Sequence, residues 1–329
     1  MRRREFIILL GGATATWPLA ARAQQPTKVR TIGFVDSRSI ESIGNRLRGF
    51  RQGLAEAGYI DGQSVAIEYR WGENQMDRVP DLVADLVRRQ VDVIVASGGT
   101  PVTLAAKAAA TKIPVVFLAA QDPVKLGLVN SLARPEGNLT GVNFFNTELA
   151  VKQFELLHEM LPSAARIAVL VVPTDRTNTE PVLREIEAAA RANNMNVEIF
   201  KANSSQEIDA TFEAIAHEHL DGVFVEQSPF LNARRVQIVQ LAARYAVPAV
   251  YSGREFTEIG GLISYGSDIA EAYRQVGTYC GLILKGAKPG ELPIVQSTKL
   301  EIVINAQTAR MLKLPVSPQL LARADEVIE

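Results

Sequence analysis

The sequence predicts an α/β fold made of two doubly wound parallel-sheet lobes, joined by a hinge that the chain crosses several times. From Val29 onward, short β-branched runs alternate with helical patterns of roughly ten to eighteen residues, which is typical of βαβ units. The alternation then runs a second time: Val91–Ser97 is similar to Leu220–Glu226, and each is followed by one helix and a strand led by proline. A hydrophobic content of 47% with 22% charged residues fits a globular protein with a well-filled core.

The first half of the chain predicts four strands and three helices. Short apolar or alternating runs predict strands at 29–35, 65–71, 91–96 and 113–118. Apolar residues at helical spacing predict helices near 47–57, 79–87 and 100–111, and Gly58 supplies a C-terminal stop for the first of them.

The second half of the chain shows the same alternation of strands and helices. Helices are predicted at 147–160, 180–193, 206–219 and 232–245, and strands at 167–172, 197–201, 223–226 and 249–252. The rest of the chain predicts a strand at 262–265, a helix at 268–285, strands near 294–298 and 301–304, and a short helical tail.

These elements are expected to form two lobes. Lobe 1 should contain residues 29–145 and about 266–288, and lobe 2 residues 146–265 and about 289–329, with crossings near 143–147, 262–266 and 288–293. A hinge between two α/β lobes creates a cleft that can close on a ligand.

The N-terminal residues 1–23 predict an export signal. Arg3 and Arg4 precede a short, weakly apolar stretch that ends in Ala21-Arg22-Ala23, a small-x-small cleavage site. The adjacent arginines favour the twin-arginine route, and the alternative is an uncleaved membrane anchor. The mature chain is therefore expected to be soluble and periplasmic.

Composition excludes several classes of function. Removing the four arginines and one glutamate of the signal from 35 basic and 36 acidic residues leaves a net charge of about −4, which gives no electrostatic reason to bind nucleic acid. Cys280 is the only cysteine, so an intrachain disulfide is impossible. The three histidines have no metal-site spacing, and neither a Walker loop nor a Gly-x-Ser-x-Gly elbow is present. We expect neither an enzyme nor a bound metal or cofactor.

The candidate ligand site follows from the rule that open parallel sheets bind ligands beyond the carboxyl ends of their strands. Free backbone N–H groups and two hydroxyls after the third strand, together with Arg254, suit a carboxylate. Asp122 suits an ammonium group, and Tyr251 and Tyr265 suit the walls of the site. Other residues indicated by this rule lie at neighbouring strand ends, namely Asp36, Arg38, Gln121, residues 174–178, Gln227 and Ser264. The candidate ligand-binding residues are Ser37, Ser97, Gly98, Gly99, Thr100, Asp122, Thr174, Ser228, Tyr251, Arg254 and Tyr265.

Several of these residues also have a purely structural interpretation. Thr100 can cap its helix, and Asp122 before a proline can stabilise a turn. Arg254 can pair with the nearby glutamates Glu255 or Glu258, and Tyr265 can pack between the lobes.

Six stretches of the chain together carry a resemblance to a known family. They are Leu47–Leu54, Val91–Ala106, Asp122–Val129, Gly137–Gly141, Gly260–Gly266 and the tail from Ile304 to Glu326. On these stretches the chain resembles the ABC transporter substrate-binding proteins of the type I periplasmic fold, in the branch of the TrpX-like proteins. Two positions depart from the family pattern: Val172 stands where the family has Asn, and Glu136 where it has Gly.

The resemblance implies a periplasmic solute-binding protein that closes on a small polar ligand and presents it to an ABC permease in the inner membrane. An amino acid or a small carboxylate is the expected ligand, and a monomer is the expected state. The alternative is a periplasmic sensor that presents its ligand to a membrane receptor.

Overall fold

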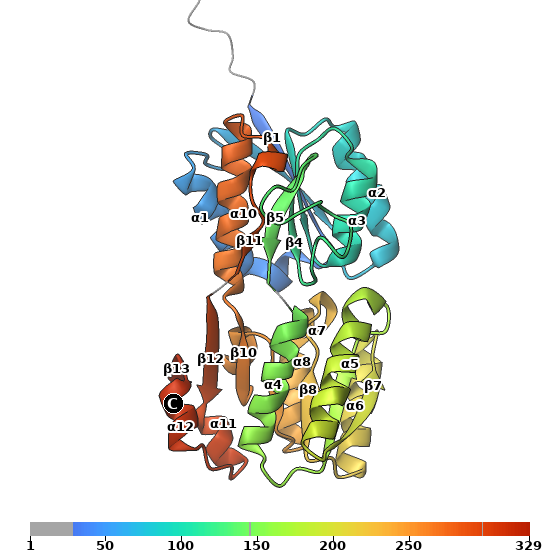
Figure 1. Ribbon diagram of the computed structural model, residues 1–329, viewed down its shortest axis with the longest axis vertical. Coiled ribbons are helices and arrows are strands. Elements are labelled where there is room, and N and C mark those ends of the chain that lie inside the picture. The colour runs from blue at the N-terminus through green and yellow to red at the C-terminus, as the bar shows by residue number, and fades with distance from the viewer. Residues whose placement is uncertain (1–28, 145, 298) are drawn as a thin grey trace, which may run out of the picture.

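Two α/β lobes lie end to end along the long axis of the molecule (Figure 1). The structure is a computed structural model that describes residues 29–144, 146–297 and 299–329. The predicted export signal, residues 1–23, lies outside these described residues. The prediction of two mostly parallel α/β lobes is confirmed.

Lobe 1 is built on a six-stranded parallel sheet in the order β11-β5-β4-β3-β1-β2. Its central strands β1, β3 and β4 are almost entirely buried, because helices cover both faces of the sheet. Helices α1 and α10 lie on one face, and α2 and α3 on the other (Figure 1). Its elements are β1 (Arg30–Asp36), α1 (Gly44–Glu56), β2 (Val65–Trp71), α2 (Val79–Arg88), β3 (Val93–Ser97), α3 (Thr100–Ala109), β4 (Val115–Ala119), β5 (Leu139–Asn143), α10 (Ile269–Leu284) and β11 (Val295–Gln296).

Lobe 2 is built on a seven-stranded sheet in the order β13-β12-β10-β9-β8-β6-β7. All pairs are parallel except β10 with β12, where the returning chain runs antiparallel. Its elements are α4 (Asn146–Met160), β6 (Arg166–Val171), α5 (Arg176–Ala192), β7 (Asn196–Lys201), α6 (Ser205–His217), β8 (Gly222–Val225), α7 (Pro229–Ala233), α8 (Arg235–Arg244), β9 (Ala249–Tyr251), α9 (Arg254–Thr257), β10 (Ile263–Ser267), β12 (Leu300–Asn305), α11 (Ala306–Met311), α12 (Pro318–Arg323) and β13 (Glu326–Ile328).

The chain crosses between the lobes at three places. The first crossing joins β5 to α4, the second joins β10 to α10, and the third joins β11 to β12. The second therefore lies just beyond the predicted 262–266. The third lies beyond the predicted 288–293, because Val295 and Gln296 pair with β5 of lobe 1. The assignment of residues 289–296 to lobe 2 was wrong, since this segment leads into and forms an edge strand of lobe 1.

Helices α1 and α10 approach each other closely through glycines. A Cβ atom added to Gly53 would lie 1.8 Å from the carbonyl oxygen of Arg274, and one added to Gly277 would lie 2.1 Å from the carbonyl oxygen of Phe50. Only glycine permits such an approach between two helix backbones. The two helices thus form one rigid layer of lobe 1, and α10 begins directly after the second crossing.

Several elements differ from the sequence prediction, among them the short helix α9, which was not predicted. Strand β5 was not predicted, and the expected helical tail ends in the short strand β13. The helix expected at 232–245 is two helices, because Ser228 caps a separate turn led by Pro229 and Arg234 leaves the helical conformation. Among the described residues, no helix is both long enough and apolar enough to cross a membrane.

Candidate functional site

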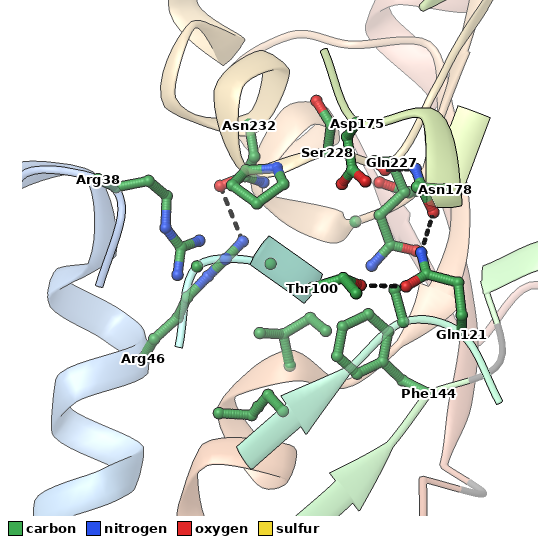
Figure 2. A pocket seen from close by; sticks show the side chains of 18 of the residues that line it. Arg38, Arg46, Thr100, Gln121, Phe144, Asp175, Asn178, Gln227, Ser228 and Asn232 are labelled. Atoms are coloured by element: carbon green, nitrogen blue, oxygen red, sulfur yellow. Dashed lines mark hydrogen bonds between the residues drawn. The ribbon is translucent and has the colours of Figure 1, made fainter. Parts of the chain in front are cut away.

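A pocket lies between the two lobes, at the carboxyl ends of both sheets (Figure 2). Lobe 1 contributes residues after β1, β3, β4 and β5, together with the start of α10. Lobe 2 contributes residues after β6, β8 and β9. The pocket therefore lies where the topology of open parallel sheets places a ligand site.

A buried ion pair forms part of the lobe 1 wall. Arg38 donates from Nε to Asp36 Oδ1 (2.8 Å) and from Nη2 to Asp36 Oδ2 (2.7 Å), and its Nη2 also donates to the Tyr273 hydroxyl (2.8 Å). Ser97 donates to Asp36 Oδ2 (2.6 Å). Burial by itself would raise the pKa of Asp36, but the Arg38 charge and these hydrogen bonds hold it below its ordinary value. Arg38 is thus a fixed cation at the edge of the pocket.

The first turn of α3 lies beside this ion pair. Gly98 and Gly99 have φ of 90° and 109°, a left-handed conformation that favours glycine and turns the chain sharply into the helix. Ser37 holds this loop by donating to the carbonyl oxygen of Gly98 (2.6 Å). The start of a helix carries partial positive charge, which favours an anion near this turn. Pro101 has no N–H group, and those of Val102 and Thr103 already donate to the carbonyl oxygen of Gly99.

The lobe 2 wall is acidic. Asp175 lines the pocket at the start of α5, and burial raises the pKa of its carboxyl group. Behind it, Glu226 is 1% exposed and accepts hydrogen bonds from the backbone N–H of Val172, from Thr179 and from Asn178. Burial raises the pKa of Glu226 to about 8. Lobe 2 therefore presents the Asp175 carboxyl group to the pocket, and the Arg38 guanidinium, paired with Asp36, lies on the lobe 1 side.

Apolar side chains complete the lobe 1 side of the pocket. Leu118, Phe144, Ile269 and the ring of Tyr273 line it. Figure 2 shows Phe144 below the polar groups, at the same end of the pocket as Gln121 and Asn178. This wall can take up the hydrocarbon part of a ligand.

Polar contacts join the two lobes around the pocket (Figure 2). Gln121 of lobe 1 donates to Asn178 Oδ1 of lobe 2 (2.6 Å), and its own oxygen accepts from the Thr100 hydroxyl. Arg46 of α1 donates to Asn232 Oδ1 of α7 (2.8 Å).

Six of the eleven candidate ligand residues lie in or directly beneath this pocket. Gly98, Gly99, Thr100 and Ser228 line it. Ser97 is buried beneath it in contact with the Asp36–Arg38 pair, and Ser37 supports the glycine loop. Thr100 and Ser228 also have local roles, since Thr100 bonds to Gln121 and Ser228 caps α7.

The structure does not bring the other five candidates to the pocket. Asp122 accepts from the backbone N–H of Val124 and stabilises a turn, and Thr174 contacts Asn203. Tyr251 is buried against Phe256 in the lobe 2 core. Tyr265 packs against the other core of that lobe. Arg254 bonds to three acidic side chains of lobe 2, namely Glu258, Glu301 and Glu326.

Several pocket residues were not among those candidates. Asp175 and Asn178 lie in the loop and first turn after β6, within the range 174–178 that the strand-end rule indicated, although only Thr174 of that range is among the eleven candidates. Arg46 and Tyr273 lie within helices, and the sequence pattern carries no signal for either. In the part of the chain that the structure describes, no group of three or more His, Cys, Asp or Glu side chains could hold a metal ion.

Comparison with known proteins gives consistent matches over nearly the whole chain. The model of the ABC transporter substrate binding protein family matches residues 28–328. A tyrosine-binding protein of Clostridioides difficile (strain R20291) is 26% identical over 286 residues, which are 87% of this chain and 81% of that protein.

Solved structures match over the same length. An ABC domain from Streptococcus pneumonia in complex with L-Trp is 28% identical, with a TM-score of 0.81 over 91% of this chain and 99% of that one. A conserved domain protein from Vibrio cholerae is 24% identical, with a TM-score of 0.83 over 91% of this chain and all of that one, and supports the fold.

Proposed function

Because the chain belongs to the family of ABC transporter substrate-binding proteins, we propose that it captures an amino acid between its lobes and delivers it to an ABC permease. This membership agrees with the resemblance predicted from the sequence. The proposal includes export to the periplasm through the N-terminal arginine-containing signal, and action there as a monomer.

The observation that carries the proposal is the pairing of a guanidinium group on the lobe 1 side of the pocket with a carboxyl group on the lobe 2 side. Lobe 1 offers the Arg38 guanidinium and the first turn of α3 for a carboxylate, and lobe 2 offers Asp175 for an ammonium group. A zwitterion satisfies both walls at once, whereas a neutral sugar satisfies neither. Burial favours the protonated form of the Asp175 carboxyl group, whereas a bound ammonium group would favour its ionised form.

The apolar wall favours an amino acid with a large apolar side chain. Leu118, Phe144 and Ile269 can pack against an aromatic or branched side chain. The tyrosine-binding relative and the structure in complex with L-Trp support this class of ligand.

Closure of the lobes is the proposed mechanism. Each lobe recognises one charged group of the ligand, so the full set of contacts forms only when both lobes close around it. Closing the cleft also removes water, which strengthens the charged hydrogen bonds to the ligand. The permease then distinguishes the closed form from the open form.

Calorimetric titration of residues 24–329 tests this function. L-tryptophan, L-tyrosine and L-leucine are compared with tryptamine, which lacks the carboxylate, and with indole-3-propionate, which lacks the ammonium group. We expect at least one amino acid to bind and each analogue of it to bind at least about tenfold more weakly, because a charged hydrogen bond contributes about 1.5–3 kcal/mol. Failure of every amino acid to bind would refute the proposal.

Two aspartate variants assign the ammonium site. Asp175→Asn should weaken binding of the amino acid but leave the affinity for indole-3-propionate unchanged, because only the amino acid has the group that contacts this carboxylate. Asp122→Asn is the matched control, since Asp122 contacts a turn outside the pocket and should leave both affinities unchanged. Equal affinities in the wild type and Asp175→Asn would contradict this assignment.

A further inference from the structure

Arg46 joins the lobes at the edge of the pocket. From α1 in lobe 1, its Nη2 donates to Asn232 Oδ1 (2.8 Å) and to Glu255 Oε1 (3.2 Å), and both acceptors belong to lobe 2. The side chain of Arg46 is 11% exposed and that of Glu255 is 19% exposed, so the ion pair is shielded from most of the solvent. Figure 2 shows Arg46 reaching from its helix toward Asn232.

Arg46 and its two acceptors belong to different lobes, which move relative to each other when the hinge bends. Arg46 lies on α1, which the glycine-mediated packing fixes against α10 in lobe 1. Asn232 lies on α7 and Glu255 on α9, which follow strands β8 and β9 of the lobe 2 sheet. Any rotation of the lobes about the hinge that widens the cleft therefore separates Arg46 from both partners.

The charges at this contact favour a closed cleft. Burial by itself would raise the pKa of Glu255, but the Arg46 charge lowers it below its ordinary value, and Arg235 acts in the same direction. Glu255 is therefore ionised at neutral pH. Opening the cleft exchanges a shielded ion pair for two separate, hydrated side chains.

We propose that Arg46 is a closure clamp, a positioning residue whose contacts with Asn232 and Glu255 set the balance between open and closed lobes. The clamp thereby sets how slowly a ligand leaves. This role deepens the proposed function and rests on it where ligand release is concerned. The effect on lobe position itself requires no ligand.

A second contact between the lobes is uncharged, so its effect on closure can be separated from that of the Arg46 clamp. Gln121 donates to Asn178 through a neutral hydrogen bond (2.6 Å), and both side chains are buried. Because this bridge carries no net charge, salt should weaken only the Arg46 clamp. The closed fraction should therefore decrease with ionic strength in the wild type.

Charge reversal and its rescue test the clamp. Arg46→Glu and Glu255→Arg each place like charges opposite one another, and the double variant restores an attractive pair. Small-angle X-ray scattering without ligand should show a larger radius of gyration for each single variant, and a value closer to the wild type for the double variant. Arg51→Glu is the matched control, because Arg51 lies on the same helix and pairs with Asp61 within lobe 1.

Stopped-flow measurement of ligand release gives the second readout. We expect each single variant to release the amino acid about tenfold faster, and the double variant to recover at least half of that change on a logarithmic scale, since Arg235 opposes full recovery. If a single variant fails to fold, Arg46→Lys replaces it, and an intermediate increase in the release rate is expected.

Each outcome decides the proposal. Single variants with wild-type scattering and wild-type release overturn the clamp. Faster release without rescue in the double variant also overturns it, because Arg46 would then act by touching the ligand. If no amino acid binds the wild type, the proposed function fails, and the scattering series alone decides the clamp.

Discussion

Replacing Gly53 by alanine tests the close contact between α1 and α10. The added Cβ would lie 1.8 Å from the carbonyl oxygen of Arg274, whereas ordinary contacts of a Cβ begin at 3.4 Å, so the helices must separate by about 1.6 Å. Such overpacking costs about 1–3 kcal/mol and occasionally more, and here the obstacle is backbone that cannot rotate away. Alanine recovers about 1 kcal/mol of helix propensity. With a cost at the upper end of that range, about 3 kcal/mol, and a gain of about 1 kcal/mol, we expect the free energy of unfolding to fall by about 2 kcal/mol.

Urea unfolding followed by tryptophan fluorescence measures this change. Once the predicted signal is removed, Trp71 is the only tryptophan, and it packs on the lobe 1 core next to Tyr69, so the signal reports the affected lobe. Gly44→Ala is the matched control on the same helix, because nothing lies within 4 Å of its added Cβ and its φ is −52°. That variant should be neutral or more stable by up to about 1 kcal/mol. Equal stability of the Gly53 and Gly44 variants would refute the reasoning.

Three other variants test the pocket. Between pH 4.5 and 8, Glu226 stays protonated in the folded chain but loses its proton in the unfolded chain. The free energy of unfolding should therefore fall by about 1.4 kcal/mol for each unit by which the pH rises. In urea titrations across this range, Glu226→Gln should remove that contribution, and an unchanged slope would contradict it. Gly99→Ala should weaken ligand binding about tenfold or more, because Gly99 has φ of 109° and its added Cβ would lie 3.3 Å from Pro229 of the opposite lobe; calorimetry that finds wild-type affinity would exclude this. Arg38→Met leaves Asp36 buried without its partner and should cost about 3–5 kcal/mol. The double variant with Asp36→Asn should regain part of that loss in the same unfolding assay, and no recovery would show that the charge is not the cause.

The fold was largely predictable because its central strands are buried on both faces. Such strands are continuous apolar runs, and the strand predicted at 91–96 overlaps the central strand β3 (Val93–Ser97). The alternating run at Val65–Trp71 forms the edge strand β2 and was predicted with the bounds that the structure has. Strand β5 was not predicted, because Thr140, Gly141 and Asn143 interrupt its apolar pattern. Its strand conformation depends on pairing with β4, which brings Gly141 next to the carbonyl oxygen of Phe117. Pairing across a sheet is a tertiary effect that local sequence does not carry.

The sequence predicted which loops line the candidate site, but it predicted fewer of the side chains that line it. The strand-end rule found the correct loops, since residues after β1, β3, β4 and β8 line the pocket. Arg254 also follows a strand, yet Glu301 and Glu326 engage it. These glutamates come from β12 and β13, far along the chain, and the antiparallel return of β12 brings them near. To predict which charged side chain at a strand end faces the pocket, one therefore needs to know how all strands of the sheet pair.

The distribution of charge between the lobes supports the proposed coupling of ligand recognition to closure of the cleft. In lobe 1, Asp36 already compensates Arg38, so the carboxylate of a ligand gains mainly from the α3 turn and from the remaining guanidinium edge. In lobe 2, no Lys or Arg side chain among the described residues is within ion-pair distance of Asp175 or Glu226. A ligand ammonium group therefore supplies a charge that lobe 2 itself does not provide. In the proposed function, the ammonium group reaches Asp175 and the carboxylate reaches α3 together only when the lobes are close, so the difference in ligand affinity between the closed and open forms drives closure.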